Sequence, residues 1–208
     1  MSAYETGAQM GEVQRHKAQM KKWVESLSGQ EKTIFDVCCA AYDEIIVERG
    51  LTEGCYLMSV FLSAYLEAKH NIITEPVVGY VNDGTDDIMI SHAWLEYQGK
   101  KCDLTLVNAP PQPKGPLLIL DVKYFRGHAQ YTYHLEKGEA ALLAEMRMSA
   151  RDPDVSAIIS AKNAEHIQMA QMVKSHQSRD AYLKGAPEGH DYGSLSALVD
   201  SALAVCRQ

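Results

Sequence analysis

The stretch from residue 55 to residue 66 is the feature that most restricts how this chain can fold. It reads Cys-Tyr-Leu-Met-Ser-Val-Phe-Leu-Ser-Ala-Tyr-Leu, and the first charged residue after it is Glu67. A helix of this composition is apolar all round, so it must be buried on every side. The chain has 208 residues, and a chain of that size can bury on the order of 70% of its unfolded surface. Gly54 directly precedes the stretch, so we expect the helix to begin close to Cys55.

Helical spacing of apolar residues precedes this stretch, and alternating spacing follows it. Ser28 and Glu31 have the spacing of a capping box, which predicts a helix start, and Gly50 predicts its end. Beyond residue 75 the pattern has period two, which predicts strands separated by turns. The expected helices cover residues 13–27, 29–49 and 55–69. The expected strands cover residues 76–81, 88–97, 101–107, 117–122 and 130–134, and the last two are expected to be neighbours in the sheet. The proline-rich residues 108–116 are expected to form an irregular connection.

From about Leu135 the pattern is helical to the end of the sequence. Asp152 precedes Pro153, a cap residue before a proline at the first helical position, and Ser194 is the expected start of the last helix. This order of elements predicts an α+β fold, with the buried helix packed on an antiparallel sheet. We expect a core of residues 1–134, N-terminal helices included, and a helical C-terminal extension of residues 135–208. The extension is expected to cover a cleft, bind a partner protein or form a homo-oligomer.

Charge and cysteine content exclude several classes of protein. The chain has 20 basic and 27 acidic residues, a formal net charge of −7, which argues against a nucleic-acid-binding protein. No window approaches 18 consecutive apolar residues, so no membrane span is expected, and the first residues do not resemble a secretory signal. Five cysteines, an odd number, favour a reducing compartment over a disulfide framework. We therefore expect a cytoplasmic protein, with export by a signal-independent route left open.

Three residues stand out as candidates for chemistry. Cys55 opens the buried helix, His92 lies within an expected strand, and Asp103 lies at the start of the next one. A thiolate is the nucleophilic form of cysteine. The first turn of a helix supplies unpaired N–H groups and the positive end of the helix dipole, which stabilise a thiolate and the oxyanion of a tetrahedral intermediate. An imidazole beside the sulfur completes an activated nucleophile.

The hairpin between the two strands decides whether His92 and Asp103 meet. A two-residue loop at Gln98 and Gly99 would place Asp103 on the same face as His92, with backbones roughly 7–8 Å apart. A carboxylate there fixes the tautomer of the ring and stabilises the imidazolium. A three-residue loop would put Asp103 on the other face, unless a bulge restored the register.

Four spans then resemble the core of the transglutaminase-like superfamily of papain-like cysteine enzymes. They are Gly54-Cys55 with the apolar helix, residues 77–81, His92-Ala93-Trp94-Leu95-Glu96, and Asp103-Leu104-Thr105, within residues 31–106. The resemblance implies a papain-like fold and acyl transfer through a thioester, with Cys55 as nucleophile, His92 as base and acid, and Asp103 as orienting carboxylate. Tyr56 stands where many members have Trp, and Leu104 where many have Pro.

Other chemically capable residues are expected to be structural. One of the adjacent Cys38 and Cys39 is predicted to face the core, and neither to be catalytic. Cys102 is predicted to pack, Cys206 to be exposed, and residues 82–87 to form a plain turn. His128 and His134 flank two tyrosines, but no further ligands for a metal can be placed beside them. A second oxyanion donor is expected upstream, and Gln30 and Trp23 are both candidates.

We therefore expect a thiol-dependent acyl-transfer enzyme, a cysteine peptidase or amidohydrolase acting on a peptide or protein, without cofactor or metal. Two alternatives use the same triad: a transglutaminase or glutamine deamidase, and an acetyl-transferring enzyme with a thioester cofactor. A non-catalytic binding module of the same fold is the alternative of a different class.

Overall fold

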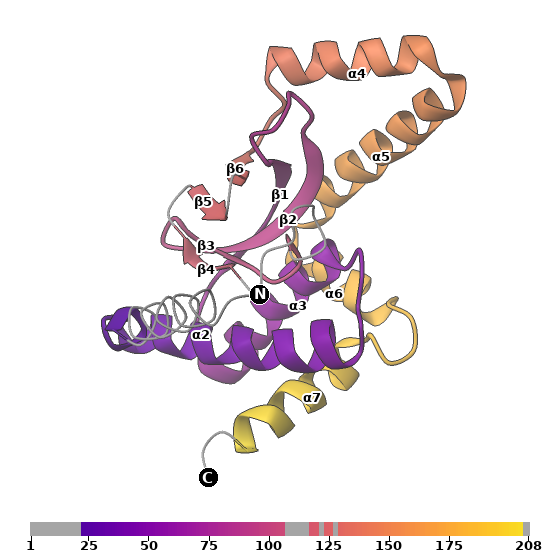
Figure 1. Cartoon of the computed structure of the whole chain (residues 1–208). Coiled ribbons are helices and arrows are strands. Elements are labelled where there is room, and N and C mark those ends of the chain that lie inside the picture. The colour runs from indigo at the N-terminus through magenta and orange to yellow at the C-terminus, as the bar shows by residue number, and fades with distance from the viewer. Residues whose placement is uncertain (1–21, 107–116, 121–122, 127–128, 206–208) are drawn as a thin grey trace, which may run out of the picture.

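The computed structural model describes residues 22–106, 117–120, 123–126 and 129–205. It combines helices and strands in the predicted order, as expected for an α+β protein (Figure 1). The elements are α2 (Gly29–Ala41), η1 (Tyr42–Glu48), α3 (Cys55–His70), β1 (Glu75–Asn82), β2 (Ile90–Tyr97), β3 (Lys100–Asp103), β4 (Leu117–Leu120), β5 (Lys123–Arg126), β6 (Ala129–His134), α4 (Glu139–Arg151), α5 (Pro153–Met172), α6 (His176–Lys184) and α7 (Tyr192–Val205).

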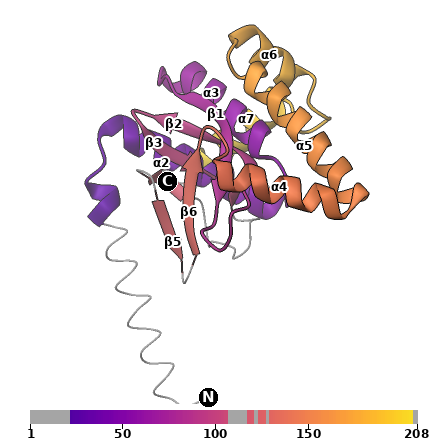
Figure 2. The ribbon, with the colours of Figure 1, turned by 90° about the horizontal axis from the view of Figure 1, so that it is seen from above.

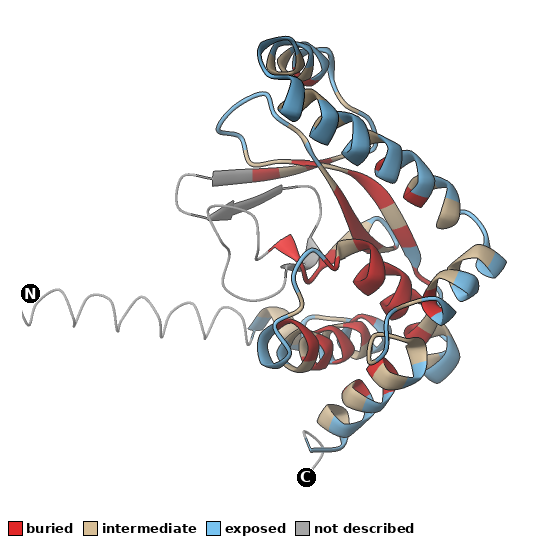
Figure 3. Cartoon of the chain, turned by 90° about the vertical axis from the view of Figure 1, so that its right-hand side faces the viewer, coloured by how far each residue is buried: buried red, intermediate tan, exposed pale blue. Residues whose placement is uncertain are grey.

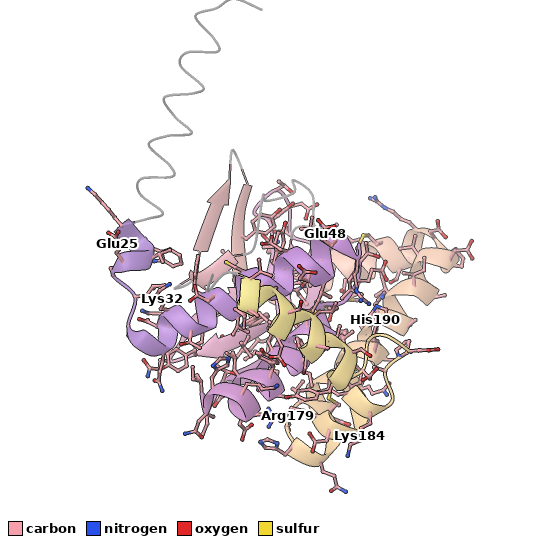
Figure 4. All side chains as sticks on the ribbon, turned by 90° about the horizontal axis from the view of Figure 1, so that it is seen from below. Glu25, Lys32, Glu48, Arg179, Lys184 and His190 are labelled. Atoms are coloured by element: carbon pink, nitrogen blue, oxygen red, sulfur yellow. The ribbon has the colours of Figure 1, made fainter. Side chains whose placement is uncertain are left out.

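Helix α3 is the centre of the main core. It starts at Cys55 after an N-cap at Gly54, and ten of its sixteen residues are buried. It packs against α2, α6 and α7 on one side and against β1 and β2 on the other. Seen from below (Figure 4), α7 crosses the helical layer formed by α2 and α3. The helix is therefore enclosed, as its lack of charge predicted.

Local sequence signals explain where the first helices begin and end. The Ser28 side chain accepts a hydrogen bond from the Glu31 N–H, and the Glu31 side chain accepts one from the Ser28 N–H, so the predicted capping box is present. The helix continues as a π-helical segment, η1, which the sequence pattern did not indicate. Gly50 follows with φ +65°, a left-handed conformation that favours glycine at a helix end.

The sheet has six antiparallel strands in the order β4-β3-β2-β1-β6-β5. The β2–β3 hairpin has the two-residue loop required above, because Gln98 and Gly99 both have positive φ and Tyr97 pairs with Lys100. Gly79 of β1 pairs with His92, and a Cβ there would lie 2.3 Å from the His134 carbonyl oxygen. Glycine is therefore required for β1 to fit between its two neighbours.

Several expected boundaries were wrong. The strand expected over 101–107 ends at Asp103, because the chain turns there around the Asp103 carboxylate. Residues 129–134 pair with β1 and β5 and not with residues 117–120, which pair with β3. The last helix starts at Tyr192, two residues before Ser194. The expected first helix lies mostly outside the described residues, as does the connection at 108–116.

Helices α4 and α5 form an arm beside the sheet. Figures 1 and 2 show α4 standing away from the helical body, and α5 leading from α4 back to the sheet. Helix α5 packs against β1 and β2, and α4 packs against α5. Within the part of the chain that the structure describes, no helix has both the length and the apolar composition for crossing a membrane.

Candidate active site

Cys55 is the first residue of α3, and its side chain is half-buried. The first hydrogen bond of the helix runs from the Met58 N–H to the Gly54 carbonyl oxygen. The N–H groups of the first turn, before Met58, therefore lack acceptors within the helix. This end of α3 can donate to a negatively charged oxygen bound next to the Cys55 sulfur.

His92 and Asp103 form a buried pair across the β2–β3 hairpin. The His92 Nε2 atom lies 2.7 Å from Asp103 Oδ2, and both side chains are buried. The Cys55 side chain also interacts with the His92 ring and helps to raise the pKa of that ring. Because Nε2 is bonded to the carboxylate, Nδ1 is the ring nitrogen left to face the sulfur. The structure thus brings the three predicted residues together, with the imidazole between the thiol and the carboxyl group.

The electrostatics of this pair favour a charged ring. Burial disfavours the imidazolium, but the charge of Asp103, its hydrogen bond to the ring and the contact with Cys55 together raise the pKa of His92 to about 10. Burial opposes ionisation of Asp103 as well, yet the His92 charge and several hydrogen bonds lower the pKa of that carboxyl group. The His92 ring therefore carries a positive charge at neutral pH, next to the Cys55 side chain.

The Asp103 carboxylate is held on both oxygens. Its Oδ1 atom accepts hydrogen bonds from the backbone N–H groups of Thr105, at 3.0 Å, and Leu106, at 3.2 Å. The turn formed by residues 103–106 therefore holds the carboxylate in place. On the other oxygen, the Tyr133 hydroxyl donates a hydrogen bond to Oδ2 at 3.0 Å.

Sequence reasoning missed Tyr133. This residue comes from β6, thirty residues after Asp103, and its ring packs edge-on against Trp94. Burial, followed by the neighbouring negative charge of Asp103, raises the pKa of Tyr133 well above its ordinary value, so the hydroxyl remains a donor. The sequence predicted that Tyr133 lies in a strand, but it gave no sign that its hydroxyl would contact Asp103.

A second polar network, also missed, flanks the first. The Tyr56 hydroxyl lies 2.7 Å from Ser91 Oγ, which lies 2.7 Å from His166 Nδ1. The His166 ring stacks on Tyr80 with centroids 4.2 Å apart. Burial, with the positive charge of Lys137 as the smaller cause, lowers the pKa of His166, so its ring is neutral at neutral pH. Tyr56 follows Cys55 and Ser91 precedes His92, so this network ties α5 to both elements of the site.

A cavity of about 470 Å³ opens at Cys55 and His92. Residues on β1 and β2 and in the loop between them line one side. The C-terminal arm lines the other side, with Met148 from α4 and Ile158, Ile159 and Lys162 from α5. Of the three expectations for the C-terminal helices, the structure therefore shows the first, because they cover a cleft at the predicted site.

The remaining candidates lie away from this cavity. Cys38 and Cys102 are buried in the main core. Among the residues that line the cavity in the described ranges, neither Gln30 nor Trp23 appears, so neither fits the expected second oxyanion donor. Gln30 accepts a hydrogen bond from the Tyr97 hydroxyl instead.

The expected turn at residues 82–87 is closed by its own hydrogen bonds, such as that from the Gly84 N–H to Asn82 Oδ1 at 2.7 Å. His134 Nε2 lies 2.7 Å from Thr132 Oγ1, and His128 and Cys206 lie outside the described residues. No group of three or more His, Cys, Asp or Glu side chains that could hold a metal ion occurs in the described ranges.

Comparison with known proteins gives no match to this chain, whether to a protein-family model, to a curated protein or to a solved structure. The functional interpretation therefore depends on the geometry of the site.

Proposed function

We propose that this protein is a thiol-dependent acyl-transfer enzyme that cleaves or exchanges an amide bond in a peptide or protein. The proposal includes a papain-like arrangement of the transglutaminase type, with the cysteine on a helix and the histidine and aspartate on neighbouring strands. The observation that supports it most strongly is the His92 ring, which lies 2.7 Å from Asp103 Oδ2 and lines the same open cavity as Cys55.

The first half of the reaction forms a thioester. The Cys55 thiolate attacks the carbonyl carbon, a C–S bond forms, and the carbonyl electron pair moves to oxygen. The free N–H groups in the first turn of α3 stabilise this oxyanion. When the oxyanion collapses, the C–N bond breaks, and the amine leaves with a proton from His92.

The second half returns the enzyme to its starting state. His92 takes a proton from water, the resulting hydroxide attacks the thioester, and the C–S bond breaks to release a carboxylic acid. An amine in place of water would give a new amide, and the enzyme would then be a transamidase. Asp103 holds the ring tautomer and stabilises the imidazolium throughout, without taking the proton.

Trapping the thioester tests this proposal. The full chain is mixed with a peptide library, quenched in acid and digested, and the peptide containing Cys55 is searched for acyl adducts by mass. We expect adducts on Cys55 that are absent from Cys55→Ala, and that disappear when a simple primary amine or time for hydrolysis is allowed before the quench. Adducts distributed equally over Cys39 and Cys55, or none at all, would overturn the proposal.

A further inference from the structure

Three exposed isoleucines converge on the cavity at Cys55. Ile88 is 39% exposed, Ile90 58% and Ile158 62%, and all three line the same cavity. They come from different parts of the chain: the loop before β2, the first residue of β2, and α5. Single exposed aliphatic side chains are common on protein surfaces, but several in one hollow mark a surface that another apolar group covers.

Charged groups on the arm side of the cavity are already paired with one another. Lys137 donates a hydrogen bond to Asn163 Oδ1 at 2.8 Å and forms an ion pair with Glu145. Lys162 pairs with Glu165 at 3.0 Å. The lysines on this side of the cavity are therefore neutralised by their own partners, while the aliphatic side chains remain open to contact with a ligand.

We propose, on the basis of the acyl-transfer function above, that this cavity binds a large aliphatic group of the acyl donor, attached next to the carbonyl that Cys55 attacks. The volume of about 470 Å³ lies within the usual range for a small-molecule or side-chain pocket. Burial of one methylene group favours binding by about fourfold, so chain length is the property that this site distinguishes.

The C-terminal arm supplies one wall of this binding site. Ile158 and Ile159 are on α5, and the His166 hydrogen bond to Ser91 fixes that helix next to His92. Selectivity for the acyl group would thus reside partly in the segment after the sheet, while the reacting groups belong to the segment before it.

Alkyl chloromethyl ketones, R–CO–CH₂Cl, test the proposal directly, because their carbonyl group stands for that of the acyl donor. The Cys55 thiolate forms a C–S bond with the methylene carbon and the C–Cl bond breaks, so that chloride leaves while His92 keeps its proton. The second-order rate constant for labelling of Cys55 in the full chain is measured by mass spectrometry with R as methyl, propyl, pentyl and heptyl. We expect it to rise by about two- to fourfold per methylene until the cavity is full.

Two exposed residues on α5 provide a matched pair of variants. Ile158, 62% exposed, lines the cavity, whereas Ile167, 58% exposed, is not among the residues that line it in the described ranges. Ile158→Asp should remove most of the dependence on chain length. Ile167→Asp should keep the full dependence. The inference is overturned if the wild type shows no dependence, or if both variants behave alike.

The same experiment separates this inference from the proposed function. If the methyl reagent labels Cys55 no faster than Cys39, both proposals fail. If Cys55 reacts fast but chain length has no effect, only the aliphatic pocket fails.

A second pair of reagents then identifies the source of the group. An N-acetyl-leucyl chloromethyl ketone that reacts about tenfold faster than its alanyl counterpart indicates a peptide side chain. Equal rates, with a rising alkyl series, indicate a linear acyl chain.

Discussion

Helices α3 and α5 both reach the site, yet they are held in the protein in different ways. Ten of the 16 residues of α3 are buried, whereas only His166 and Met169 are buried among the 20 residues of α5. Figure 3 shows this contrast, with α3 buried along most of its length and the arm exposed. Helix α3 is fixed by the surrounding core, and α5 by a few contacts near the site.

The difference separates two roles. The core around α3 supplies the stability that fixes Cys55, because large buried side chains contribute most of the free energy of folding. The arm supplies the shape of the cavity and little of the core. Substitutions in α3 should therefore act on the whole fold, and substitutions in α5 on the site and on local opening.

The largest expected effect is on global stability. Phe61→Ala removes a fully buried ring from α3 and should lower the free energy of unfolding by about 3–5 kcal/mol. Ile167→Ala on the exposed face of α5 should change it by less than about 0.5 kcal/mol. Urea denaturation followed by circular dichroism measures both. Similar losses would show that the two helices contribute equally to the core.

The buried pair at the site gives the next largest effect, and it depends on pH. Asp103→Ala leaves His92 buried without its partner and should cost about 3 kcal/mol near pH 6. The folded pKa of His92, about 10, lies above its ordinary value of 6.5. The stabilisation from the pair is therefore complete below pH 6.5 and is lost as the pH rises through 10. The measured difference between variant and wild type should accordingly be smaller at pH 9 than at pH 6.

An exposed carboxylate gives the control for that prediction. Asp36 pairs with Lys32 at 3.2 Å on the surface of α2, and both side chains are exposed. Asp36→Ala should cost less than about 1 kcal/mol, and this cost should be nearly the same at pH 6 and pH 9. An Asp103→Ala effect that grows with pH would contradict the assignment of the charged ring.

His166, which holds the arm against the sheet, should contribute less to the global stability than Asp103 but more to the local stability of α5. His166→Ala removes the hydrogen bond to Ser91 and the stacking on Tyr80, which together contribute about 1–2 kcal/mol. Hydrogen exchange should become faster in the second half of α5 and stay unchanged in α3. Lys184→Ala, at an exposed position on α6, should leave both helices unchanged. Faster exchange in α3 would show that the arm and the core are coupled.

The smallest effect concerns the start of α5. The Asp152 side chain accepts hydrogen bonds from the backbone N–H groups of Asp154 and Val155. Asp152→Ala should cost about 1 kcal/mol, by loss of the N-cap. Faster exchange confined to the first turn of α5 is the expected readout, with the exposed Asp180→Ala as control. No change in that turn would contradict the role of the cap.

The parts of the fold that were predictable from sequence depend on local signals. The capping box needs only Ser28 and Glu31, and the burial of α3 follows from its own composition. The two-residue loop at Gln98 and Gly99 fixes the β2–β3 register, which is why the meeting of His92 with Asp103 could be predicted.

The parts that were not predictable depend on distant segments. Tyr133 and His166 reach the site from 30 and 75 residues beyond their partners Asp103 and Ser91. No spacing rule connects such positions. The cavity likewise needs the arm to fold back on the sheet, and α5 has no buried face long enough to show this in its sequence pattern.

The most direct test of the account is the alkylation rate of Cys55 relative to Cys39, measured by mass spectrometry with iodoacetamide at pH 7. Both side chains are half-buried, so access alone does not favour either. We expect Cys55 to react at least about tenfold faster, and His92→Ala to abolish this advantage. Equal rates in the wild type, or an advantage that persists without His92, would contradict the claim that the buried imidazole activates this thiol.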